Sequence, residues 1–109
     1  MKRTKLLAMV MTTAIAATGA VCAANAEGIP AEDLKVGAIY IGDENEGYTA
    51  AHMAGIDEMM EKFGLDESQV IEKTLIGEDE TCYDAAADLA DQGCQIIFGT
   101  SFGHETYLI

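Results

Sequence analysis

The chain has 109 residues and a formal net charge of −13, with 19 acidic side chains against six basic ones. Such a charge repels nucleic acid and anionic membrane surfaces, so neither is an expected partner. The length is enough for one small domain and no more.

The first 26 residues predict a secretory signal peptide. MKRTK is a short cationic start, LLAMVMTTAIAA is an apolar run, and small residues follow it. The run is too short and too rich in Ala and Thr for a membrane span, which needs about 20 apolar residues. Ala24-Asn25-Ala26 fits an A-x-A cleavage site, so we expect a soluble exported protein that begins at Glu27. The alternative is a lipid anchor on Cys22, for which Val21 is a poor preceding residue.

Residues 27–109 would form the mature protein and carry a net charge of −16, because the leader removes three of the six basic residues. Their last stretch, HETYLI, has the pattern of a loop that enters a helix without a stop signal. We therefore expect a truncated sequence, the first part of a larger α/β lobe, and poor stability for 27–109 alone.

Three short apolar runs alternate with two amphipathic segments. KVGAIYI (35–41) predicts a buried strand, and 49–63 predicts a helix with Thr49 as its N-cap and Gly64 after its end. VIEKTLI (70–76) predicts a second strand at a more exposed edge.

The third strand follows a second predicted helix. Thr81 and Asp84 approximate a capping box for a helix over 82–92, which Gly93 ends, and CQIIFG (94–99) predicts a third buried strand. The β-α-β-α-β order indicates right-handed crossovers and a parallel sheet with helices on both faces, which is an α/β fold.

The cysteines of the mature chain are expected to be free thiols. Cys82 and Cys94 would lie at opposite ends of one helix, about 18 Å apart, whereas a disulfide needs Cα atoms within about 7 Å. Cys94 is expected to be a small core residue. A thiol–histidine metal site with His52 or His104 is the alternative, but no C-x-x-C or H-x-x-x-H spacing supports it, so no metal or cofactor is expected.

A ligand site is expected where the strand order reverses, beyond the carboxyl ends of the strands. If the first strand lies between the other two, GDENEGYT (42–49) and TSFGH (100–104) meet there. The acids of the first loop favour a neutral or cationic ligand over a phosphate, although a solvated loop explains them equally well.

Tyr48 would stack on a planar ligand or plug the end of the sheet, and His52 lies one turn into the helix. Gly55 would let this helix approach the sheet closely.

The segment GTSFG (99–103) matches the G-x-S-x-G motif of a hydrolase nucleophile elbow. A catalytic triad also needs an acid and a histidine, and His104 is too close in sequence to be the usual base. A binding loop is therefore favoured, in which Thr100 and Ser101 hydrogen-bond to a polar ligand edge and Phe102 stacks or packs.

Two motifs together resemble the start of the basic membrane protein family. K-V-G-x-I-Y (35–40) is followed by G-x-x-x-x-G-Y-T-x-x-H-x-x-G (42–55), and a G-x-x-I-I-F-x-T-S-F-G segment spans 93–103. Members of this family are extracytoplasmic solute-binding proteins of ABC importers and are related to purine nucleoside receptors. The resemblance covers essentially the whole predicted mature chain. The dense acids between Gly42 and Gly47 depart from the family pattern, as does the poor context of Cys22.

The resemblance implies a type I periplasmic-binding-protein fold, in which two α/β lobes close on a ligand. It implies a purine nucleoside or base as ligand, an ABC permease in the membrane as partner, and no catalysis. Tyr48 would stack on the base with Thr49 and His52 near it, and Thr100, Ser101 and Phe102 would line the same cleft. The family chain is roughly three times longer, so the resemblance also implies that the second lobe is missing from this sequence.

Three other functions remain as alternatives. A secreted serine hydrolase would use Ser101, and a sensor of the same fold would pass ligand occupancy to a membrane receptor. A cytoplasmic phosphoacceptor domain has the same strand order, but the signal peptide and the lack of an aspartate ending the third strand disfavour it.

Overall fold

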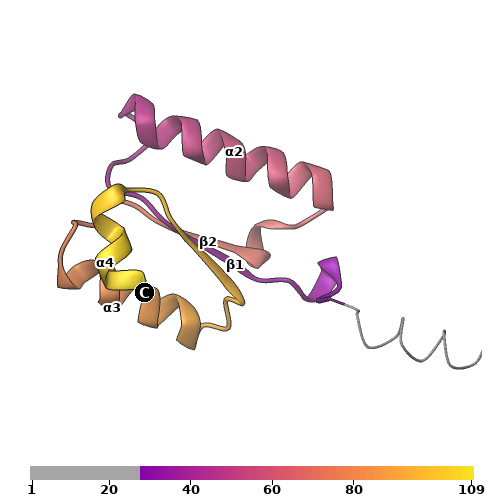
Figure 1. Ribbon diagram of the computed structural model, residues 1–109. Helices are drawn as coiled ribbons and strands as arrows, with labels where there is room; N and C mark the ends of the chain where they lie inside the picture. Colours follow the sequence, from indigo (N-terminus) through magenta and orange to yellow (C-terminus); the bar gives the residue numbers. More distant parts are fainter. Residues whose placement is uncertain (1–27) are drawn as a thin grey trace, which may run out of the picture.

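The computed structural model describes residues 28–109, which form an α/β structure around a parallel sheet (Figure 1). The predicted signal peptide and both processing alternatives, at Ala26 and at Cys22, lie outside these residues. The strands are β1 (Val36–Ile39), β2 (Val70–Lys73) and β3 (Ile96–Gly99), in the order β2-β1-β3. The prediction that the first strand lies between the other two is confirmed.

Helices cover both faces of the sheet, as predicted. Helix α2 (Gly47–Phe63) connects β1 to β2 on one face, and α3 (Glu80–Asp91) connects β2 to β3 on the other, where α4 (Glu105–Leu108) also lies (Figure 1). Three short 3-10 helices complete the described residues: η1 (Ala31–Asp33), η2 (Glu67–Gln69) and η3 (Phe102–His104). The β-α-β-α-β order is therefore confirmed.

The tightest packing lies between the sheet and α3. Ile39 of β1 forms a buried cluster with Cys82, Ala85 and Leu89 of α3. Gly37 makes this close approach possible, because a Cβ atom there would lie 2.9 Å from the Cδ1 atom of Leu89. The core thus holds the strands and α3 together as one layered unit.

The opposite face is only partly covered. Val36, Ala38 and Tyr40 are fully buried, but Ile96 and Phe98 of β3 are 43% and 41% exposed. The prediction of a buried third strand is therefore wrong. Helix α2 joins β1 to β2, so it leaves the face of β3 uncovered, and an apolar sequence alone does not show which neighbour covers it.

Both predicted N-caps are wrong, by three positions for α2 and by two for α3. Glu46 caps α2 by accepting hydrogen bonds from the backbone N–H groups of Tyr48 and Thr49, at 2.7 and 2.8 Å. Asp79, and not Thr81, caps α3. A carboxylate satisfies the free amides of a helix start and also complements its dipole. At the other end, Gly64 follows the last residue of α2, as predicted, and its φ of 67° is left-handed.

The second strand is shorter than predicted. It ends at Lys73, and the chain then turns around the end of β1 through Leu75, whose φ of 57° is left-handed. The Leu75 N–H donates to the Gly42 carbonyl and the Ile76 N–H donates to the Tyr40 carbonyl, at 3.0 and 2.9 Å. These bonds tie the loop after β2 to the loop after β1.

Two smaller expectations have different outcomes. The prediction of two free thiols is confirmed: Cys82 is buried, and Cys94 is half-buried against the core cluster. The close-packing role predicted for Gly55 is wrong, because a Cβ atom there would meet nothing within 4 Å.

Candidate functional site

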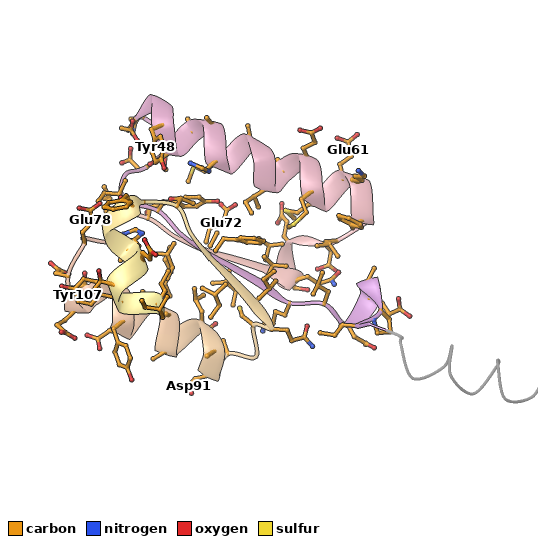
Figure 2. The ribbon with its side chains drawn as sticks, viewed as in Figure 1. Tyr48, Glu61, Glu72, Glu78, Asp91 and Tyr107 are labelled. Atoms are coloured by element: carbon orange, nitrogen blue, oxygen red, sulfur yellow. The ribbon has the colours of Figure 1, made fainter. Side chains whose placement is uncertain are left out.

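Three loops meet at the carboxyl ends of the strands, one after each strand. The loop after β3 is joined to β1 by Thr100, whose N–H and hydroxyl both donate to the Ile39 carbonyl, at 3.2 and 3.1 Å. The loop after β2 is joined to the loop after β1 as described above. Figure 2 shows Tyr48 and Glu78 at this end of the molecule. The predicted meeting of the first and third loops is therefore observed, and the second loop joins them.

Tyr48, in the first turn of α2, has its ring held at two points. Its hydroxyl donates a hydrogen bond to the carbonyl oxygen of Thr100. The ring meets the His52 ring edge-on, with centroids 4.7 Å apart and an angle of 74° between the planes. The side chain nevertheless stays 51% exposed. Tyr48 is thus a fixed aromatic surface that still faces solvent.

A hollow of about 430 Å³ lies between α2 and the neighbouring strands β1 and β3. The helix contributes His52, and the loop after β3 contributes Thr100. The wall is otherwise mostly apolar. Its remaining residues are Ala38, Ala51, Gly55, Ile56, Met59, Phe98 and Gly99. The hollow combines an apolar wall with a few polar groups, as small-molecule sites do.

Thr49 is placed differently from the other predicted site residues. Its side chain is fully buried, and its hydroxyl accepts a hydrogen bond from the Gly42 N–H at 3.1 Å. Thr49 therefore fixes the start of the loop after β1 against α2. It does not line the hollow.

Ser101 and Phe102 also lie outside the wall of the hollow. The Ser101 hydroxyl donates to the carboxylate of Glu78, from the loop after β2. Phe102 is 90% exposed. The structure thus brings Tyr48, His52 and Thr100 together, and it places Ser101 and Phe102 at the same end of the sheet beyond them.

His104, at the end of the loop after β3, is fully buried. Its Nε2 atom lies 2.9 Å from the Ile76 carbonyl oxygen, and its Nδ1 atom is buried without a hydrogen-bond partner among the described residues. The imidazole and the Ser101 hydroxyl therefore bind different groups, Ile76 and Glu78, and no hydrogen bond joins them in residues 28–109.

The loop after β1 is strongly acidic, and its three acids have different roles. Glu46 is the cap of α2, and hydrogen bonds from the N–H groups of Thr49 and Tyr48 lower the pKa of its carboxyl. Asp43 accepts from the Asn45 N–H at 2.9 Å, which stiffens the loop. Glu44 is exposed. Their charge in the loop before α2 disfavours an anionic ligand there.

Replacing Glu46 with glutamine is expected to destabilise the protein at neutral pH and to have little effect in acid. The lowered pKa means that the carboxylate contributes its full stability above its unfolded pKa of about 4.3, and loses it as the pH falls through the folded value. The difference between wild type and Glu46→Gln, measured by urea denaturation at a series of pH values, should shrink below about pH 4. Glu44→Gln in the same loop is the matched control. A difference that stays constant over the whole range would contradict this account of the cap.

Two contributors to this region could not be singled out beforehand. Glu78 is one acid among several in GEDE (77–80), between the second predicted strand and the second predicted helix. The rule that parallel strands end at one edge could have placed this stretch at the site. Phe98 was assigned to a buried strand, and it reaches the wall of the hollow because α2 leaves β3 uncovered.

The comparisons with known proteins give no family assignment. No protein-family model matches the chain, and no curated protein matches it. Within residues 28–109, none of the helices has the length and apolar character needed to cross a membrane. The same residues include no group of three or more His, Cys, Asp or Glu side chains arranged to hold a metal ion.

Proposed function

We propose that this protein is an extracytoplasmic solute-binding protein of an ABC importer, of the basic membrane protein type. The three-stranded α/β structure would be the first part of one lobe of a type I periplasmic-binding-protein fold. The ligand would be a purine nucleoside or a free purine base, which the protein delivers to a permease in the membrane. The protein would be exported, with soluble export favoured over a lipid anchor on Cys22.

The observation that carries this proposal is the held but exposed ring of Tyr48. A planar ligand that stacks on an aromatic ring gains most when the ring is already fixed, because little side-chain freedom is then lost on binding. The bond to Thr100 and the contact with His52 supply that fixation. The 51% of its surface that remains exposed is available to the ligand.

The adjacent hollow suits a flat, mostly apolar molecule with a polar edge. Its volume of about 430 Å³ lies within the usual range for small-molecule sites, roughly 300–1,000 Å³. Phe98 and Met59 offer apolar contact, while His52 and Thr100 offer hydrogen-bonding groups. A purine has both features.

The acidic loop supports a nucleoside or base over a nucleotide. Glu46 and Asp43 hold their carboxylates beside the start of α2, where a phosphate would otherwise find free backbone amides. Glu46 already occupies the Tyr48 and Thr49 amides. A phosphate would therefore meet negative charge and few donors.

The partners of Ser101 and His104 favour binding over hydrolysis. A serine nucleophile needs a histidine base within hydrogen-bond reach, whereas Ser101 donates to Glu78 and His104 contacts the Ile76 carbonyl. In this proposal Ser101 and Phe102 belong to the rim of the site, and Thr49 supports it from below. Labelling of Ser101 by an active-serine probe, lost in Ser101→Ala, would instead establish the hydrolase.

The proposal is tested by calorimetric titration of the full-length protein. Adenine, adenosine, guanosine and inosine form the purine panel, with ribose and AMP as controls for the sugar and the phosphate. Saturable heat with at least one purine, and weaker or no binding of AMP and ribose, is the expected result. Binding of ribose alone, or of none of these molecules, would overturn the purine assignment.

A further inference from the structure

Glu78 joins two loops that the sheet itself does not connect. It lies in the loop between β2 and α3, while its carboxylate contacts the loop after β3 (Figure 2). One oxygen, Oε1, accepts hydrogen bonds from the Ser101 hydroxyl and from the Gly103 N–H, the latter at 3.1 Å. These two donors stand on either side of Phe102, so a single carboxylate oxygen fixes both flanks of that residue.

The contact is close as well as polar. A Cβ atom on Gly103 would lie 2.2 Å from the Glu78 carboxyl carbon, so a residue with a side chain at 103 would displace the carboxylate. The carboxylate therefore packs directly against the backbone of the loop. Hydrogen bonds from a hydroxyl and an amide to a charged acceptor are stronger than bonds between neutral groups.

The base of Glu78 is itself held in place. The next residue, Asp79, caps α3 through the Thr81 N–H at 2.9 Å, and Ile76 bonds to the Tyr40 carbonyl on the other side. The loop after β3 is also attached at Thr100, which bonds to Ile39 and Tyr48, and at His104, which contacts the Ile76 carbonyl. Glu78 holds the stretch between these two points, at Ser101 and Gly103.

We infer that Glu78 is a positioning residue, which holds residues 100–103 in the geometry that completes the ligand site. This inference rests on the proposed function and adds to it a residue that would act through the loop rather than through contact with the ligand. Without Glu78 the loop would keep its bonds at Thr100 and His104, and the stretch between them, at Ser101 and Gly103, would be released. The Thr100 carbonyl, and with it Tyr48, would then be less well fixed.

The first test compares three variants by titration with the purine that wild type binds best. Glu78→Ala should bind about tenfold more weakly, as expected from losing two hydrogen bonds to a charged group. Glu78→Gln should recover most of the affinity, because its amide oxygen still accepts. Glu80→Ala, at an exposed carboxylate in the first turn of α3, is the matched control and should bind like wild type. Equal affinity in wild type and Glu78→Ala would overturn the inference.

The second test needs no ligand. The amide proton of Gly103 should shift with pH as Glu78 titrates, below the usual range of a glutamate, because bonds from Ser101 and Gly103 lower the pKa of this carboxyl. The titratable groups beside Glu78 include its sequence neighbour Asp79 and, on the loop after β3, His104, which also lowers the pKa of Glu78. The acid-range shift should vanish in Glu78→Gln, while any contribution from those two groups would persist.

The two tests separate the inference from the proposed function. Gly103 titration with no purine binding by wild type would overturn the proposed function while supporting the loop contact. Two other outcomes would overturn the positioning role and leave the proposed function standing. In the first, wild type binds a purine but its Gly103 amide proton shows no acid-range shift. In the second, Glu78→Ala binds the purine as tightly as wild type.

Discussion

Replacing Leu89 with alanine is expected to lower the free energy of unfolding by about 3 kcal/mol, within the range for buried leucines. Leu89 is fully buried in the cluster with Ile39, Cys82 and Ala85, and it lies directly over Gly37 of the central strand. The truncation removes apolar contacts and leaves a cavity between the sheet and α3. Urea denaturation followed by circular dichroism measures the change.

The matched control is the same substitution at Leu75, which is 68% exposed in the turn after β2. Leu75→Ala should change the free energy of unfolding by less than about 0.5 kcal/mol, as surface changes usually do. Equal losses at the two positions would mean that the sheet and α3 do not form the main core.

Replacing Tyr48 with alanine is expected to weaken purine binding by about 10- to 100-fold, since a stacked base contributes roughly 1–3 kcal/mol. The change removes the fixed ring and also its bond to the Thr100 carbonyl. Tyr48→Phe keeps the ring and should retain most of the affinity. Calorimetric titration with the best-bound purine gives the three dissociation constants.

Tyr83 provides the matched control for Tyr48. It is 59% exposed on α3, which covers the opposite face of the sheet from α2 (Figure 1). Tyr83→Ala should leave binding unchanged. A comparable loss in both alanine variants, or none in Tyr48→Ala, would contradict the assignment of Tyr48 as the stacking residue.

The sheet could be predicted from sequence because its signals are local and strong. Segments with helical periodicity separate three short apolar runs, at 35–41, 70–76 and 94–99. This order predicts a parallel sheet with crossover helices. The meeting of the loops after β1 and β3 followed from the same topology, which brings Tyr48, His52 and Thr100 close together. Their role in ligand binding stays a prediction.

The parts that could not be predicted depend on tertiary packing. Thr49 is a residue type that often caps helices, but its buried hydroxyl binds the Gly42 N–H, and Glu46 caps α2 instead. Ile96 and Phe98 read as core residues, since a sequence shows that a residue is apolar without showing what covers it. Glu78 has no spacing signal at all, because its partners lie 23 and 25 residues away.

The most direct test of a purine site at this end of the sheet is to map adenosine onto the protein by the amide chemical shifts of the full-length chain. We expect saturable shifts at Tyr48, His52 and residues 98–103, around the hollow between α2 and β3. We expect no shifts around Asp57, Glu67 and Glu72, which line a separate hollow on the β2 side. Saturable shifts centred on that second hollow, or none anywhere, would contradict the claim that the carboxyl ends of these strands hold a purine.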